Sequence, residues 1–170
     1  MAYTIMNPSV GYAPIAASVL TAGTDYRKPI PHGTIVTATD PTYGSGEFIF
    51  LKGLDATAVG SWVTYNLDDG STTLLAANAI GPVAIAMAAT LTGYSGWYQI
   101  SGKGVGKVLA SYADNGLVWA TATAGSVDDA VADGDMVHLA KGASAIGTPS
   151  AGLAEFEISR PYVDDIAGND

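Results

Sequence analysis

The chain has 170 residues, of which 48% are apolar and only 14% are charged, and its net charge is −9 at pH 7. An average soluble domain has about 25% charged residues, so this composition predicts a surface partly covered by partners. The acidic balance argues against nucleic-acid binding, which needs cations to displace phosphate counterions. Cysteine is absent, which excludes disulfides, a thiolate nucleophile and cysteine-based metal centres. We expect neither a signal peptide nor a membrane span, because no apolar run is long enough.

Residues 1–33 are predicted to form an extended N-terminal arm. Four prolines punctuate this segment, and each removes a backbone donor and restricts the preceding residue to extended geometry. The arm could reach over a neighbouring molecule, or form a first strand across its own domain. Its apolar and aromatic side chains include Tyr3, Ile5, Met6, Val10 and Tyr12.

Residues 34–163 are predicted to form a β domain of short strands separated by turns. Residues 34–39 alternate threonine with apolar residues, which is typical of a half-buried strand. Runs rich in β-branched and aromatic residues then recur roughly every 8–15 residues between glycine-rich turns, which predicts a compact all-β sandwich or barrel of short antiparallel strands. These runs are 47–51, 61–65, 82–87, 96–100, 106–110, 117–120, 136–140 and 155–158. Residues 164–170 are expected to be a flexible acidic tail.

The sequence predicts no catalytic site and therefore no enzyme. His32 and His138 are the two histidines, and we interpret both as structural or solvent-facing. The segment 93–96, Gly-Tyr-Ser-Gly, has the wrong spacing for the nucleophile elbow Gly-x-Ser-x-Gly, and no helical pattern follows it. We interpret it as a turn that leads into a strand.

Cofactor and metal sites are not predicted either. Ser101–Lys107 resembles the phosphate-binding loop Gly-x-x-x-x-Gly-Lys-Ser/Thr. However, Ser101 occupies the position of the first glycine, and Val108 occupies the position of the hydroxyl residue that would bind magnesium. It is interpreted as a turn or bulge. The acidic segments 68–70 and 128–135 lack the closing glutamate and the flanking helices of a calcium loop, so they are interpreted as solvated turns.

Four aromatic residues are singled out because they lie in predicted strands. They are Trp62, Trp97, Tyr98 and Trp119. Packing in the core or in a subunit interface is the favoured interpretation. A carbohydrate-binding face that uses Trp97 and Tyr98 is the alternative.

The stretch from Ile80 to Val163 resembles a recurrent design of small head proteins in tailed bacteriophages. Four segments carry the resemblance: 80–86 (IGPVAIA), 93–102 (GYSGWYQISG), 122–130 (ATAGSVDDA) and 158–163 (ISRPYV). The family that the chain resembles is the capsid decoration, or cement, proteins. The resemblance covers about half of the chain and consists of strand and small-residue patterns without catalytic signatures.

This resemblance implies a non-enzymatic structural protein of the virion. It implies a compact β domain, in a homotrimer, that is made in the host cytoplasm and seated on the capsid exterior, where it binds the major capsid protein. In several family members an N-terminal arm adds a strand to the capsid protein. The candidate capsid contacts are therefore Tyr3, Ile5, Met6, Val10 and Tyr12. The alternatives are a phage tail, connector or fibre component, or a carbohydrate-binding β module.

Overall fold

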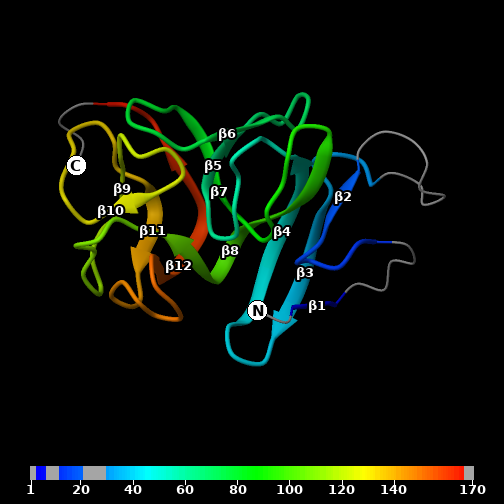
Figure 1. Cartoon of the computed structure of the whole chain (residues 1–170), viewed down its shortest axis with the longest axis horizontal. Helices are drawn as coiled ribbons and strands as arrows, with labels where there is room; N and C mark the ends of the chain where they lie inside the picture. Colours follow the sequence, from blue (N-terminus) through cyan, green and yellow to red (C-terminus); the bar gives the residue numbers. More distant parts are fainter. Residues whose placement is uncertain (1–2, 7–11, 21–29, 167–170) are drawn as a thin grey trace.

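The computed structural model describes residues 3–6, 12–20 and 30–166, and within them it contains strands but no helix (Figure 1). The prediction of an all-β protein is confirmed. In this part of the chain no helix is long and apolar enough to cross a membrane. The strands are β1 (Thr4–Ile5), β2 (Ser18–Leu20), β3 (Ile35–Asp40), β4 (Gly44–Lys52), β5 (Trp62–Tyr65), β6 (Thr72–Leu74), β7 (Gly81–Ala86), β8 (Tyr94–Lys107), β9 (Trp119–Ala120), β10 (Val127–Asp128), β11 (His138–Gly142) and β12 (Leu153–Val163).

One large antiparallel sheet organises the molecule. Its strands follow the order β1-β3-β4-β8-β12-β7-β5-β6, and β2 and β11 join it by pairing with β8 and β12. The sheet curls into a half-barrel, which is consistent with the predicted compact barrel or sandwich. A separate two-stranded sheet, β9 with β10, lies beside β11 (Figure 1).

The longest strand, β8, is the centre of the sheet. One of its edges pairs with β4, and its other edge pairs in turn with β2, β7 and β12. Gly102 bends the strand with a φ of +100°, and a Cβ at this position would lie 2.5 Å from the carbonyl oxygen of Ser45. Only glycine fits such a conformation and such a close approach. The predicted strand 96–100 and the first two residues of the predicted strand 106–110 therefore belong to one bent strand, which ends at Lys107.

Buried side chains form three clusters on the faces of this sheet. Alternation explains them: successive residues of β7 and β8 point to opposite faces, so each strand supplies two clusters. The first cluster includes Trp62, Val83, Ile85, Tyr112, Phe156 and Ile158. The second includes Ala13, Ile15, Val36, Phe48, Phe50 and Trp97. The third consists of Ile49, Leu51, Val63, Ala84, Ala86, Tyr98 and Ile100.

The segment predicted as an arm, residues 1–33, contributes two strands to this sheet. β1 pairs with β3, and β2 pairs with β8 at residues 94–96. Ala13 and Ile15 are buried in the second cluster. The described parts of the segment thus lie across their own domain, as in the second of the two interpretations above.

Several other strands differ from the expected boundaries; β12, for example, spans Leu153–Val163 where 155–158 was predicted. In the predicted strand 117–120 only Trp119 and Ala120 form β9, and β11 begins at His138 instead of residue 136. These residues pair in short, irregular ladders, so local propensity alone does not fix their ends. Of the predicted acidic tail, the structure describes residues 164–166.

Candidate functional site

The arm residues predicted to contact a capsid lie mainly against their own sheet. The ring of Tyr3 packs edge-on against Phe48, with centroids 4.8 Å apart, and Tyr12 packs 6.0 Å from Trp97. Ile5 is half-buried against the same cluster, whereas the side chain of Met6 is 57% exposed. Val10 lies outside the described residues. Among the four described candidates, Met6 is the most accessible to a partner.

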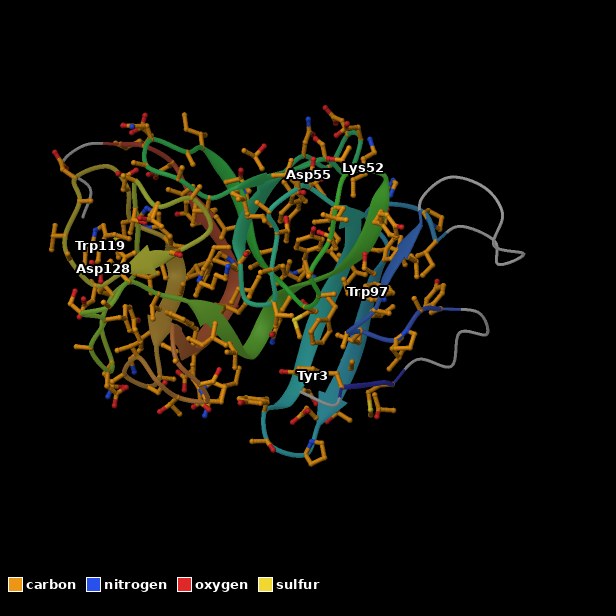
Figure 2. All side chains as sticks on the ribbon, viewed as in Figure 1. Tyr3, Lys52, Asp55, Trp97, Trp119 and Asp128 are labelled. Atoms are coloured by element: carbon orange, nitrogen blue, oxygen red, sulfur yellow. The ribbon has the colours of Figure 1, made fainter. Side chains whose placement is uncertain are left out.

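Polar contacts fasten this N-terminal segment to β8. The hydroxyl of Tyr3 donates to the carbonyl oxygen of Lys103 at 2.9 Å, and the indole Nε1 of Trp97 donates to the carbonyl oxygen of Ala13 at 3.0 Å. Figure 2 shows both aromatic side chains at the N-terminal side of the sheet. Burial raises the pKa of Tyr3 to about 12, so its hydroxyl stays a donor at cellular pH.

All four aromatic residues singled out from the sequence are buried. Trp62 and Tyr98 are completely buried, Trp97 is 1% exposed and Trp119 is 5% exposed. A sugar needs an exposed ring face on which to stack, and neither Trp97 nor Tyr98 offers one. The carbohydrate-binding alternative therefore loses the two residues on which it depended.

The two histidines occupy different settings: the ring of His138 stacks on Tyr162 and its Nε2 lies 3.5 Å from Asp164 Oδ2, whereas His32 contacts a serine. His32 Nε2 lies 2.9 Å from Ser95 Oγ, and its ring stacks on Phe50. Burial, followed by nearby Lys52, lowers the pKa of His32. A serine beside a histidine is the pair that acyl transfer uses, but Ser95 is 1% exposed and sits inside β8 between β4 and β2. The contact joins a half-buried imidazole to a buried hydroxyl, and the Ser95 side chain is not exposed to a substrate.

The acidic residues are used as local anchors. Within the described ranges, no three His, Asp or Glu side chains gather in a way that could hold a metal ion. Asp135 accepts a hydrogen bond from the backbone nitrogen of Asn78 at 2.5 Å, and Asp129 accepts one from Ala113 at 2.9 Å. Asp69 pairs with Lys52 at 3.1 Å, and hydrogen bonds, first from Ser71, lower its pKa to about 2.

Asp128 is, together with Asp135, one of the two buried carboxylates of the acidic segment 128–135. It faces Trp119 across the β9–β10 ladder, and Figure 2 shows the two side by side. Asp128 is only 8% exposed, and neither its Oδ1 atom nor Trp119 Nε1 has a hydrogen-bond partner in the described part of the chain. Burial raises the pKa of Asp128, which favours its neutral form.

An exposed apolar surface lies where β7, β12 and β11 run side by side. Tyr162 of β12 pairs with Pro82 of β7 on one side and with His138 of β11 on the other, so these three residues form a row across the strands. Ile80 and Leu139 lie near the two ends of this row. Ile80 is 71% exposed, Leu139 61% and Tyr162 42%. Exposed apolar side chains on neighbouring strands are a feature of association sites. We call these residues, Ile80, Pro82, Leu139 and Tyr162, the Ile80–Tyr162 surface.

Two bulged residues shape this surface. Between the pairs His138–Tyr162 and Ala140–Ile158, β11 contains one residue and β12 contains three. Leu139 and Arg160 within this irregularity have φ values of +59° and +53°. A left-handed conformation costs a residue with a side chain about 1–2 kcal/mol, so the surrounding structure must impose it. The guanidinium of Arg160 is held by Glu47, with Nη2 and Oε2 3.1 Å apart.

A surface groove of about 500 Å³ adjoins the Ile80–Tyr162 surface and shares Leu139 with it. Lys103 in the groove pairs with Glu155 at 2.7 Å, while Glu157 stands opposite both Lys103 and Lys141 in the ladders. Charges of both signs therefore lie next to the apolar row. The lining residues are Gly102, Lys103, Leu139, Ala140, Lys141, Glu157, Ile158 and Ser159.

Sequence reasoning did not select the Ile80–Tyr162 surface. Ile80 and Tyr162 belong to segments that carry the family resemblance, but nothing local showed that these segments pair. Pairing between residues 82 and 162 depends on the order of strands in the sheet. The surface could have been found from exposed-looking apolar residues at strand ends next to Pro82 and Pro161. Proline has no backbone N–H, so the hydrogen-bonded ladder between strands lacks a donor at these positions.

Comparison of the chain with protein-family models, with curated proteins and with solved structures gave no match.

Proposed function

We propose that this protein is a virion structural protein that binds the outside of a tailed-bacteriophage capsid and stabilises it. The observation that carries the proposal is the Ile80–Tyr162 surface. Two segments that resemble decoration proteins, 80–86 and 158–163, pair with each other there and expose apolar side chains. The function proposed from the resemblance thereby gains a surface through which it can act.

The physical role of such a surface is to bind the assembled shell in preference to free subunits. Covering an exposed leucine or isoleucine completely stabilises a complex by about 1.5–3 kcal/mol before the costs of association. A protein that binds many identical sites on an assembled shell stabilises that shell by mass action. The major capsid protein is the proposed partner, and a homotrimer is the proposed state in which the protein binds it.

Fewer residues of the N-terminal segment are proposed to contact the capsid than the sequence suggested. Tyr3, Ile5 and Tyr12 contribute to the protein's own second cluster, and their removal would expose it. Met6, with 57% of its side chain exposed, remains available to a partner. We therefore place the main capsid contact on the Ile80–Tyr162 surface and an auxiliary contact at Met6.

The test is the copy number of the protein in purified virions, measured by quantitative mass spectrometry against the major capsid protein. A copy number comparable to that of the capsid protein is expected, together with cleavage by an added protease while the shell stays intact. A handful of copies would assign the protein to the tail, connector or fibre instead. Its absence from virions would refute a structural role.

A further inference from the structure

The turn between Tyr112 and β9 contains an asparagine followed by a glycine. Asn115 is exposed, with a φ of +57°, and Gly116 follows it directly. The carbonyl oxygen of Gly116 accepts a hydrogen bond from the Gly142 nitrogen at 2.9 Å, whereas the nitrogen of Gly116 has no hydrogen-bond acceptor among the described residues. The backbone nitrogen after Asn115 is therefore not held by any competing contact.

We propose that Asn115 is a site of spontaneous deamidation. The nitrogen of Gly116 attacks the side-chain carbonyl carbon Cγ of Asn115, a C–N bond forms, and the side-chain amide leaves as ammonia. Water then opens the cyclic imide at either carbonyl, which gives aspartate or isoaspartate. Water is the only co-reactant, and no electrons are transferred. Glycine permits the attack because it has no Cβ to crowd the nitrogen.

The chain contains a close internal comparison in Asn78. This residue is also exposed and has a φ of +59°, so its backbone conformation resembles that of Asn115. It is followed by Ala79, whose Cβ crowds the attacking nitrogen. Asn66 offers a second comparison, since Leu67 follows it and its Oδ1 already accepts a hydrogen bond from Asp68 at 2.9 Å. The structure thus separates the effect of the following residue from that of exposure.

Conversion of Asn115 would alter contacts that hold the turn. Asp129 Oδ2 accepts from the nitrogen of Ala113 at 2.9 Å, and a new carboxylate at position 115 would add negative charge beside Asp114 and Asp129. Isoaspartate also lengthens the main chain by one bond just before Gly116, whose carbonyl anchors Gly142. This turn is next to Tyr112, which is 1% exposed in the first cluster, so conversion loosens the cover of that cluster.

The experiment is prolonged incubation of the full-length protein at mildly alkaline pH, followed by peptide mass spectrometry. We expect the peptide with Asn115 to gain the mass of amide-to-acid conversion before the peptides with Asn66 and Asn78, and the intact protein to shift to more acidic species on ion exchange. The proposal would be overturned if Asn78 and Asn115 converted at equal rates. It would also be overturned if Asn115 remained an amide, whether or not Asn78 converted.

The control variant is Asn115→Gly, which fits the left-handed conformation and cannot form the imide. It should remove the early acidic species while the slower conversion of Asn66 and Asn78 continues. An undiminished early acidic species in Asn115→Gly would also contradict the assignment. The measurement is independent of capsid binding, so its failure leaves the proposed function unaffected.

Discussion

The hydroxyl of Tyr3 and the carbonyl oxygen of Lys103, 100 residues apart in the chain, are joined by a hydrogen bond of 2.9 Å. The bond ties the first described residue to the bent half of β8. The same carbonyl accepts a second bond from Gln99 Nε2 at 3.0 Å, so Tyr3 contributes to the support of the bend. The N-terminal segment is thus part of the folded domain.

Tyr3→Phe should lower the free energy of unfolding by about 0.5–1.5 kcal/mol, because it removes this hydrogen bond and keeps the ring against Phe48. Chemical denaturation measures the change. Tyr94→Phe is the matched control, since Tyr94 is 37% exposed, and it should leave stability nearly unchanged. Equal effects of the two substitutions would show that the Tyr3 hydroxyl contributes nothing to stability.

Phe156→Ala should lower the free energy of unfolding by about 3–5 kcal/mol, because it leaves a cavity in the first cluster. Phe156 is completely buried, and its ring contacts Trp62 and Tyr112 with centroids 4.9 Å and 5.4 Å away. Thermal and chemical unfolding both report the loss. Leu67→Ala, at a side chain that is 68% exposed, serves as the control and should change stability little. A small effect at Phe156 would contradict its place in the core.

Asp128→Asn should flatten the pH dependence of stability. Burial raises the pKa of Asp128 above 3.8, so the folded protein binds the proton more tightly than the unfolded chain does. The contribution of Asp128 to the free energy of unfolding is therefore greatest at acidic pH. It falls as the pH rises from about 3.8 through the raised pKa. Unfolding curves of the two proteins across this range should diverge as the pH increases, with the variant becoming relatively more stable. Parallel curves would mean that Asp128 titrates normally.

Leu139→Gly should separate stability from binding. Glycine relieves the left-handed strain at position 139, which should raise the free energy of unfolding by about 1 kcal/mol. The same change removes an exposed apolar side chain of the Ile80–Tyr162 surface, so co-sedimentation with purified capsids should weaken. Leu117→Ser, at another exposed leucine, is the binding control. Unimpaired binding by Leu139→Gly would remove Leu139 from the proposed contact.

The strands were predictable where their signal is local. Residues 34–39 alternate in sequence, and β3 alternates in burial in the structure, because one of its faces lies on the second cluster. The turn residues at 68–70 likewise separate β5 from β6. Glycine-rich Ser101–Lys107 was interpreted as a turn or bulge between two strands, and this was wrong: pairing with β12 makes it the second half of β8, bent at Gly102.

The contacts that define the candidate surface were not predictable from local patterns. Tyr162 lies beside Pro82, and His32 beside Ser95, only because of the order in which the strands pair. The burial of Trp97 depends on a segment 84 residues earlier in the chain. There the carbonyl oxygen of Ala13 accepts a hydrogen bond from the indole nitrogen of Trp97. Sequence patterns describe one strand at a time, whereas such contacts require knowledge of its neighbours.

The changing neighbours of β8 also determine when this protein can fold. Its second half, from Ser101 to Lys107, pairs with residues 153–159, which follow it by about fifty positions. During synthesis that edge stays unpaired until β12 has left the ribosome, while its glycines contribute little local stability. We therefore expect the sheet to close as a late and slow step, after β12 has been synthesised.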